Sequence, residues 1–300
     1  MNIIEKRSEI LFCYDVTDAN PNGDPMDENK PRIDEETKIN IVTDVRLKRT
    51  IRDYLYEYKG YNGQNGKDIF VREIFINNDP AKGIQDGKTR AKDYNNNPEN
   101  VLKECIDIRL FGGVIPLDKD SITFTGPVQF KMGRSLHKVE LKHIKGTGAF
   151  ASKAGSKQAT FRDEYILPYS FICFHGIINE MAAKYTHLTE EDVSELLDAM
   201  WNGTKNLISR SKFGQMPRLL LKITYKEPGY FIGDLDKLIK LTDYENEFSI
   251  RSTKDFKLDI SSLIDIAEKN KDKIECIEYK LDENLQIIPA IPSNWNVLNI

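Results

Sequence analysis

Cysteine and long apolar runs are both scarce in this chain of 300 residues. The four cysteines lie far apart and form no Cys-x-x-Cys pair: Cys13, Cys105, Cys173 and Cys276. This spacing argues against a disulfide framework and a zinc site, and it is typical of a protein in a reducing cytoplasm. No stretch approaches the ~20 uninterrupted apolar residues of a membrane-spanning helix. The first residues lack the apolar centre of a signal peptide, so we expect a cytoplasmic protein without a membrane segment.

Metal ligands in a recognisable spacing are also missing. The four histidines, His137, His143, His175 and His187, show no ligand spacing. Five aspartates lie in or just before a turn-rich segment at residues 18–34, which we call the acidic loop: Asp15, Asp18, Asp24, Asp27 and Asp34. Their spacing does not match an EF-hand, and the run Asn20-Pro-Asn-Gly-Asp-Pro25 is ordinary turn chemistry. We therefore favour a structural turn over a metal site, and we expect no cofactor.

Two further motifs resemble catalytic signatures without completing them. Gly83-Ile-Gln-Asp-Gly-Lys-Thr89 is one residue shorter than a P-loop, and no buried strand leads into it. Ser209-Arg-Ser-Lys212 matches Ser-x-x-Lys, but the Ser-Asp-Asn and Lys-Thr-Gly partners of that nucleophile are missing. We interpret the first as a flexible loop and the second as a phosphate-binding loop, and we predict that the chain is not an enzyme. A nucleotide-binding enzyme that uses the first motif stays an alternative.

Charge is unevenly distributed along the chain. Lys and Arg number 43 against 47 Asp and Glu, which gives a net charge of −4. Residues 131–160 nevertheless contain seven basic residues and one acid, and residues 204–226 contain six basic residues and no acid. Such sorting predicts a track for a polyphosphate partner. The alternative is that both windows are ordinary solvated faces.

Apolar periodicity predicts an α+β fold. Six segments carry strong patterns: strands at 8–17, 121–134, 169–178 and 218–225, and helices at 43–58 and 189–201. The first strand has apolar residues on both faces, so we expect each face to be covered. In chain order the six segments give the ferredoxin-like β-α-β-β-α-β arrangement of the common RNA-recognition sheet. Thr189 and Asp192 predict a capped start for the second helix.

Donors for phosphate gather around the acidic loop and the first helix. Arg46 and Arg49 lie three residues apart and share a helix face, and Arg32 can approach them from the loop. Asn20 and Asn22 add neutral donors beside the start of that helix. A second group follows the other helix and combines hydroxyl, amide, backbone and cationic groups: Ser209, Arg210, Lys212, Gly214 and Gln215. For Arg46 and Arg49 the alternative is an ordinary amphipathic surface helix.

Eight short motifs occur in order between residues 10 and 225. They are Asn20-Pro-Asn-Gly-Asp-Pro25, Arg32-Ile-Asp34, Val42-Thr-Asp-Val-Arg-Leu-Lys-Arg49, Leu110-Phe-Gly112, Thr125-Gly-Pro-Val-Gln129, Gly133-Arg-Ser135, Phe174-His-Gly176 and Ser209-Arg-Ser-Lys212. Together they resemble the CRISPR-associated backbone subunit of type I interference complexes (Cascade), a member of the RAMP superfamily. The nearest branch is subtype I-B, with subtype I-C as its neighbour.

The resemblance implies a division of the chain. The implied parts are a modified RNA-recognition palm (1–57, 119–136 and 169–226), a helical fingers-type insertion (58–118), a projecting thumb hairpin with a mobile tip (137–168), and a C-terminal extension packed on the palm (227–300). Several copies of such a non-catalytic subunit would line up along the spacer of a CRISPR guide RNA, holding its backbone whatever its sequence. Each thumb would reach over a neighbour's RNA and kink it, which leaves short base runs exposed. The implied partners are guide RNA, target DNA reached through the guide, further copies of the chain and other Cascade subunits.

The resemblance also implies RNA contacts for single residues. These are Asn22 and Arg32 beside the RNA, Arg46 and Arg49 on phosphates, Arg134 and Ser135 at the start of the thumb, and the loop from Ser209 to Gln215. Phe150, in the outer thumb, could be an apolar wedge between bases or could pack inside the hairpin. In related type III backbone subunits an aspartate of the corresponding loop cuts target RNA. The alternative function is therefore a metal-dependent RNase that uses Asp24 or Asp27.

Overall fold

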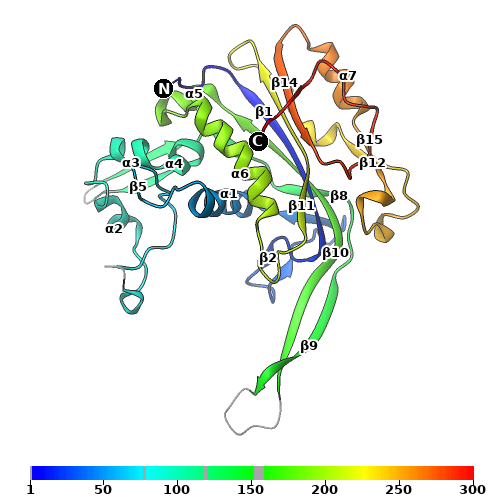
Figure 1. Cartoon of the computed structure of the whole chain (residues 1–300), viewed down its shortest axis with the longest axis horizontal. Helices are drawn as coiled ribbons and strands as arrows, with labels where there is room; N and C mark the ends of the chain where they lie inside the picture. The colour runs from blue at the N-terminus through cyan, green and yellow to red at the C-terminus, as the bar shows by residue number, and fades with distance from the viewer. Residues whose placement is uncertain (1, 77–78, 118–119, 152–158) are drawn as a thin grey trace.

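The computed structural model describes residues 2–76, 79–117, 120–151 and 159–300, and one large sheet forms its centre (Figure 1). In spatial order its strands are β16 (Asn296–Val297), β14 (Ile274–Leu281), β11 (Gln215–Tyr225), β1 (Ser8–Ala19), β10 (Ala159–Ile178), β8 (Gly133–Lys138) and β4 (Ile39–Val42). Two further strands, β7 (Val128–Phe130) and β9 (Lys142–Ala151), also pair with β10. β1 is antiparallel to both of its neighbours. The first strand therefore lies at the centre, between partners from much later in the chain.

Two helices cover one face of this sheet. α1 (Asp44–Tyr58) and α6 (Glu190–Lys205), the latter preceded by α5 (Glu180–Thr186), pack against each other and against alternate residues of β1 such as Phe12. The Thr43 side chain caps α1 by accepting from the amide of Arg46 at 3.3 Å. Thr189 and Asp192 form the predicted capping box of α6. None of the helices in the described part of the chain is long and apolar enough to cross a membrane.

The C-terminal extension covers the opposite face. Leu11 and Cys13, which alternate along β1 with the first set, pack into a second core with Phe256 and Leu263. The extension consists of η3 (Leu235–Lys237), β12 (Lys240–Thr242), η4 (Glu247–Ser249), η5 (Thr253–Asp255), β13 (Lys257–Asp259), α7 (Ser261–Lys269), β14, β15 (Ile287–Ile288) and β16. Both faces of the first strand are therefore covered, as its pattern predicts.

The insertion forms a small body beside α1 with a core of its own (Figure 1). Its elements are η2 (Pro80–Lys82), α2 (Gly87–Lys92), α3 (Pro98–Glu104), α4 (Ile106–Phe111), β5 (Gly112–Pro116) and β6 (Ser121–Thr125). The carboxylate of Asp107 is fully buried and joins this body to α1. It accepts from Nε of Arg52 at 2.9 Å and from the amide of Phe70 at 2.7 Å.

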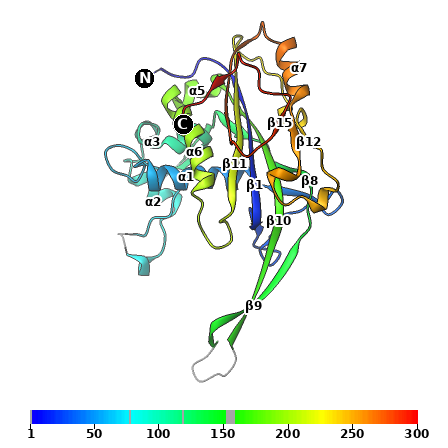
Figure 2. The same cartoon turned by 45° about the vertical axis from the view of Figure 1, so that its right-hand side comes forward.

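A hairpin of β9 and β10 projects from one end of the sheet in both views (Figures 1 and 2). β10 is continuous, so its first half belongs to the hairpin and its second half to the central sheet. The stretch predicted to be a mobile tip, residues 146–155, falls partly on residues 152–158, which lie outside the described residues. Near the base of the hairpin, β2 (Gly23–Asp24) and β3 (Lys30–Pro31) form a short ribbon within the acidic loop.

The predicted α+β class is confirmed, and five of the six patterned segments match single elements. The exception is the strand predicted at 121–134, which is divided among β6, β7 and the start of β8. Gly126 and Pro127 interrupt it. A Cβ on Gly126 would lie 2.0 Å from the carbonyl carbon of Phe111, and a proline has no amide to donate to a sheet.

Candidate nucleic-acid interface

The loop between α6 and β11, residues 206–214, is bonded to the end of β1. The amide of Thr17 donates to the carbonyl of Gly214 at 3.1 Å, and the amide of Asn20 donates to the carbonyl of Ser211 at 2.9 Å. These backbone bonds join the start of the acidic loop to the loop that follows the second core helix. Two of the predicted phosphate-binding segments are therefore direct neighbours.

The acidic loop is also bonded to α1 and to the hairpin. The side-chain carbonyl of Asn22 accepts from both the amide and the hydroxyl of Thr43, each at 2.9 Å. The hydroxyl of Tyr165 on β10 donates to the carboxylate of Glu28 at 2.7 Å. The acidic loop, the start of α1, the hairpin base and the 206–214 loop thus meet at one end of the sheet (Figure 1).

Arg46 and Lys212 are neighbouring cations without a carboxylate partner. Nη2 of Arg46 donates to the hydroxyl of Thr50 at 3.0 Å, and its buried Nε has no partner. The ammonium of Lys212 donates to the carbonyl of Asn20 at 2.5 Å. Burial lowers the pKa of Arg46. Burial and the nearby charge of Arg46 together lower the pKa of Lys212 to about 8. Within the described residues neither cation has a carboxylate within 4.0 Å; the nearby Asp53 acts on the charge of Arg46 but pairs with Arg49. Two adjacent cations of this kind are chemically suited to an anion.

Arg32 is held differently, by an acid of its own loop. Its Nη1 lies 2.5 Å from the carboxylate of Asp24, while its buried Nε has no partner. Lys30 pairs in the same way with Asp27 at 2.7 Å. The two aspartates considered as nuclease residues therefore both neutralise cations. In the part of the chain that the structure describes, no group of three or more His, Cys, Asp or Glu side chains is placed to hold a metal ion.

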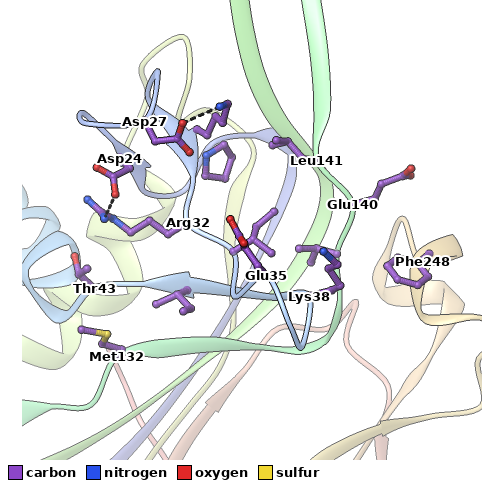
Figure 3. A pocket seen from close by; sticks show the side chains of 15 residues that line it. Asp24, Asp27, Arg32, Glu35, Lys38, Thr43, Met132, Glu140, Leu141 and Phe248 are labelled. Atoms are coloured by element: carbon purple, nitrogen blue, oxygen red, sulfur yellow. Dashed lines mark hydrogen bonds and ion pairs between the residues drawn. The ribbon is translucent and has the colours of Figure 1, made fainter.

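These ion pairs stand at the edge of an open cleft of about 760 Å³ (Figure 3). Its walls combine the acidic loop with the base of the hairpin at Leu141 and with Phe248 of the C-terminal extension. Met132 and Ile41 add apolar surface. Because its rim carries paired charges, this cleft offers less to a phosphate than the Arg46–Lys212 pair does.

Three of the predicted contact residues shape the interface from within. Asn20 is buried and donates from Nδ2 to the carbonyl of Asn29 at 2.7 Å. Gln215 is buried and donates to the carbonyl of Lys212 at 3.2 Å. Gly214 has φ +106°, and a Cβ there would lie 2.5 Å from the carbonyl oxygen of Thr17. These residues fix the course of the backbone that presents Lys212.

Three other predicted residues are exposed on the surface of this end. Ser209 accepts at its carbonyl from the amides of Lys212 and Phe213, at 3.1 Å and 2.8 Å, which closes the loop into a turn. Arg210 pairs across to Glu164 on β10 at 2.7 Å. Arg49 lies one helical turn from Arg46 and pairs with an acid on its own helix, Asp53, at 2.6 Å.

The residues predicted at the start of the thumb have different environments. Arg134 is exposed, with its guanidinium 4.0 Å from the carboxylate of Asp34. Ser135 is buried; its hydroxyl accepts from the amide of Asn40 at 2.9 Å and donates to the carbonyl of His137 at 2.7 Å. Both bonding roles of that hydroxyl are used inside the sheet, so it does not face a ligand. The backbone of Phe150 belongs to β9, but its side chain lies outside what the structure describes.

The two basic windows do not form one continuous track. Arg218 pairs with Asp15 at 2.9 Å, and Lys222 pairs with Glu278 at 2.8 Å, both across neighbouring strands. Lys131 pairs with Asp234 of the extension at 2.5 Å. These cations neutralise acids that are distant in sequence, and the prediction that the whole windows line a track is wrong for them.

Sequence reasoning missed one exposed residue of the interface. Phe213 follows Lys212 directly, and its side chain is 68% exposed. An aromatic residue in a short loop that is otherwise rich in small, polar and charged groups is the signal that could have identified it.

Comparisons with known proteins agree with the predicted resemblance. The sequence profile of the family described as CRISPR-associated protein Cas7 matches residues 6–261. The CRISPR-associated protein Cas7 of Haloferax volcanii is 33% identical over 309 aligned positions, which cover 94% of this chain and 88% of the relative. Two solved chains share the fold at 12% identity. One is from a CRISPR RNA-guided surveillance complex in a pre-nicking state (TM-score 0.59, 98% of this chain and 96% of that chain), the other from a CRISPR RNA-guided surveillance complex (TM-score 0.51, 96% of each). The chain belongs to the Cas7 family.

Proposed function

We propose that this protein is the non-catalytic backbone subunit of a type I CRISPR interference complex of the subtype I-B branch. Several copies line up along the spacer of a guide RNA, hold its sugar-phosphate backbone whatever the sequence, and present the bases for pairing with target DNA. Family membership and the likeness in fold to chains of surveillance complexes support this proposal. Its partners are the guide RNA, target DNA through the guide, other copies of the chain and other Cascade subunits.

One observation carries the proposal: the partly buried cations Arg46 and Lys212 adjoin each other, and among the described residues neither has a carboxylate within ion-pairing distance, since the nearby Asp53 pairs with Arg49. Desolvated cations of like charge repel, so the site is stabilised when an anion enters. Backbone phosphates supply such anions at regular spacing and carry no sequence information. Arg49 continues the site along α1, and Arg134 lies near the hairpin base. The site therefore suits a strand that must keep its base edges free.

The parts of the chain take the roles that the resemblance implies. The palm comprises β1, α1, β8, the second half of β10, α6 and β11, and its sheet order supports the ferredoxin-like assignment. The insertion serves as fingers, and the β9–β10 hairpin serves as a thumb long enough to reach a neighbouring copy. The extension packs on the palm through the second core.

The direct test is RNA binding by single-site variants. Arg46→Ala and Lys212→Ala should weaken binding to RNA of any sequence and flatten the logarithmic salt slope by about one unit for each lost phosphate contact. Lys254→Ala, an exposed lysine of the extension, is the matched control and should change neither quantity. Filter binding over a range of salt concentrations measures both. A wild-type protein without RNA affinity at low salt would contradict the proposal.

A second test concerns catalysis. A complex assembled with a CRISPR array should leave complementary labelled RNA intact in the presence of magnesium. Regular cuts that disappear in Asp24→Ala or Asp27→Ala would replace this proposal with the nuclease alternative.

A further inference from the structure

The 206–214 loop displays an aromatic ring that the fold does not use. The side chain of Phe213 is 68% exposed, and among the described residues no aromatic ring or cation packs on it. The loop nevertheless holds it in place, because the amide of Phe213 donates to the carbonyl of Ser209 and Gly214 is bonded to Thr17. A single exposed phenylalanine is common on protein surfaces. Phe213 differs from such a residue in two ways: hydrogen bonds hold the turn that carries it, and it directly follows Lys212 of the proposed anion site.

Phe213 is also next in the chain to a cation of the proposed anion site. Phe213 follows Lys212, whose ammonium lies beside Arg46 without a carboxylate partner in the described chain. Base and phosphate belong to one nucleotide, so a strand whose phosphate is held by this pair has a base near the loop that carries Phe213. A protein partner would need a contiguous apolar patch of several hundred Å². The other exposed large apolar residue of the loop, Ile208, stands five residues away along the chain.

We propose that Phe213 is a stacking platform for one unpaired nucleobase of the strand whose phosphates Lys212 and Arg46 hold. This inference rests on the proposed function. Stacking uses the π-face that every base possesses and leaves the hydrogen-bonding edge free, so it tolerates any sequence. The loop would then fix a nucleotide at two points, its phosphate and its base. The same ring could accept a base from the guide or from a displaced single strand of DNA.

The test compares single strands with and without bases. Phe213→Ala should weaken binding of a short oligouridine RNA by at least about fivefold, the loss expected for one base–aromatic stack. It should leave the affinity for an abasic strand of the same backbone unchanged. Phe213→Trp should bind at least as tightly as wild type, and its emission should be quenched by RNA. The native Trp201 and Trp295 are only 7% and 8% exposed and give a steady background. Repeating the quenching measurement with single-stranded DNA of the same length shows whether the ring prefers a base of the guide RNA or of a displaced DNA strand.

Matched variants separate the possible failures. Ile208→Ser removes another exposed apolar side chain of the loop and should have no effect. Phe213→Leu should behave like Phe213→Ala; if it binds like wild type, and the alanine defect occurs only on RNA long enough for two copies, the ring contacts a second copy and the inference is wrong. Equal losses on abasic and base-containing strands would also overturn it. Failure of the wild type to bind either strand would instead refute the proposed function.

Discussion

If Lys212 holds a phosphate as proposed, we expect RNA binding to depend on pH. The pKa of Lys212 is lowered to about 8 by burial and by the charge of Arg46, and a bound phosphate stabilises the protonated form. RNA binding therefore takes up a proton wherever the free lysine is neutral. We predict that RNA affinity is nearly constant below about pH 7 and falls above about pH 8, by up to about tenfold per pH unit for one proton. Fluorescence anisotropy at constant ionic strength measures this profile.

The matched control keeps the charge. In Lys212→Arg the side chain stays protonated over the whole range, so its affinity should not follow this profile. A wild-type profile that is flat through pH 8 would contradict the prediction. Stability depends on pH in the opposite sense. The folded protein binds fewer protons than the unfolded chain between pH 8 and the ordinary value of 10.5, so Lys212 makes stability rise with pH there.

Gly214 is the residue on which the shape of the 206–214 loop depends. Its φ of +106° is unfavourable for any side chain, and a Cβ would approach the carbonyl oxygen of Thr17 to 2.5 Å. We predict that Gly214→Ala lowers the free energy of unfolding by about 1–3 kcal/mol, since strained backbone and a clash both contribute. Urea denaturation measures the loss. Gly229→Ala is the control, because its φ is +78° but nothing lies within 4 Å of the added carbon; a loss as large as that at Gly214 would show that the clash is unimportant.

At the scale of single elements, local signals in the sequence predicted five of the six patterned segments but missed the division of residues 121–134. The capping box of α6 needs only Thr189 and Asp192, three residues apart, and it forms as predicted. The burial of Ser135 was not evident from the sequence, because the apolar residue of β8, Leu136, lies on the opposite face from Ser135. Arg134 and Ser135 therefore face opposite sides, and only one of them could reach RNA. The two residues of this motif therefore have different environments, which their adjacency in the sequence does not reveal.

The insertion depends on one buried carboxylate for its attachment to α1. Asp107 accepts from Arg52 and from the amides of Phe70 and Val71. Asp107→Ala would leave a partly buried guanidinium and two amides without partners, so we predict a loss of about 3–5 kcal/mol in the free energy of unfolding. Limited proteolysis should then cut first within the insertion. Asp93→Ala, which removes a more exposed partner of Arg90, should cost far less; equal losses would mean that Asp107 is no special anchor.

At the scale of the whole molecule, sequence patterns do not predict which cations are free to bind a ligand, because charges pair across strands that are far apart in the chain. Arg218 and Asp15 are 203 residues apart and yet lie in one ion pair. Nothing in the sequence of residues 204–226 indicates that an acid of β1 will neutralise Arg218. The residues of the proposed anion site, Arg46 and Lys212, are distinguished by having no such ion pair among the described residues. That property becomes visible only when the sheet is assembled.

One buried network joins the palm to the C-terminal extension. Glu9 on β1 accepts from His175 on β10 at 2.7 Å, from the hydroxyl of Tyr225 on β11, and from the amides of Ile232 and Gly233. Burial alone would raise the pKa of Glu9, but the bonds from His175 and Tyr225 outweigh it and lower the pKa. Burial likewise opposes the charged form of His175, but Asp236 and Glu9 raise its pKa overall. The network therefore favours the charged form of both groups.

The directions of these pKa shifts set the pH range in which the network stabilises the fold. The contribution of His175 is fully present below its ordinary value of 6.5 and is lost as the pH rises through its raised pKa. The contribution of Glu9 is present above 4.5 and is lost as the pH falls through its lowered pKa. We predict that His175→Gln costs more stability at about pH 6 than at about pH 9. Urea denaturation at both values, beside His187→Asn at an exposed histidine, measures the difference. An equal cost at both pH values would mean that His175 contributes by packing alone, and that its charge does not help to hold the extension on the palm.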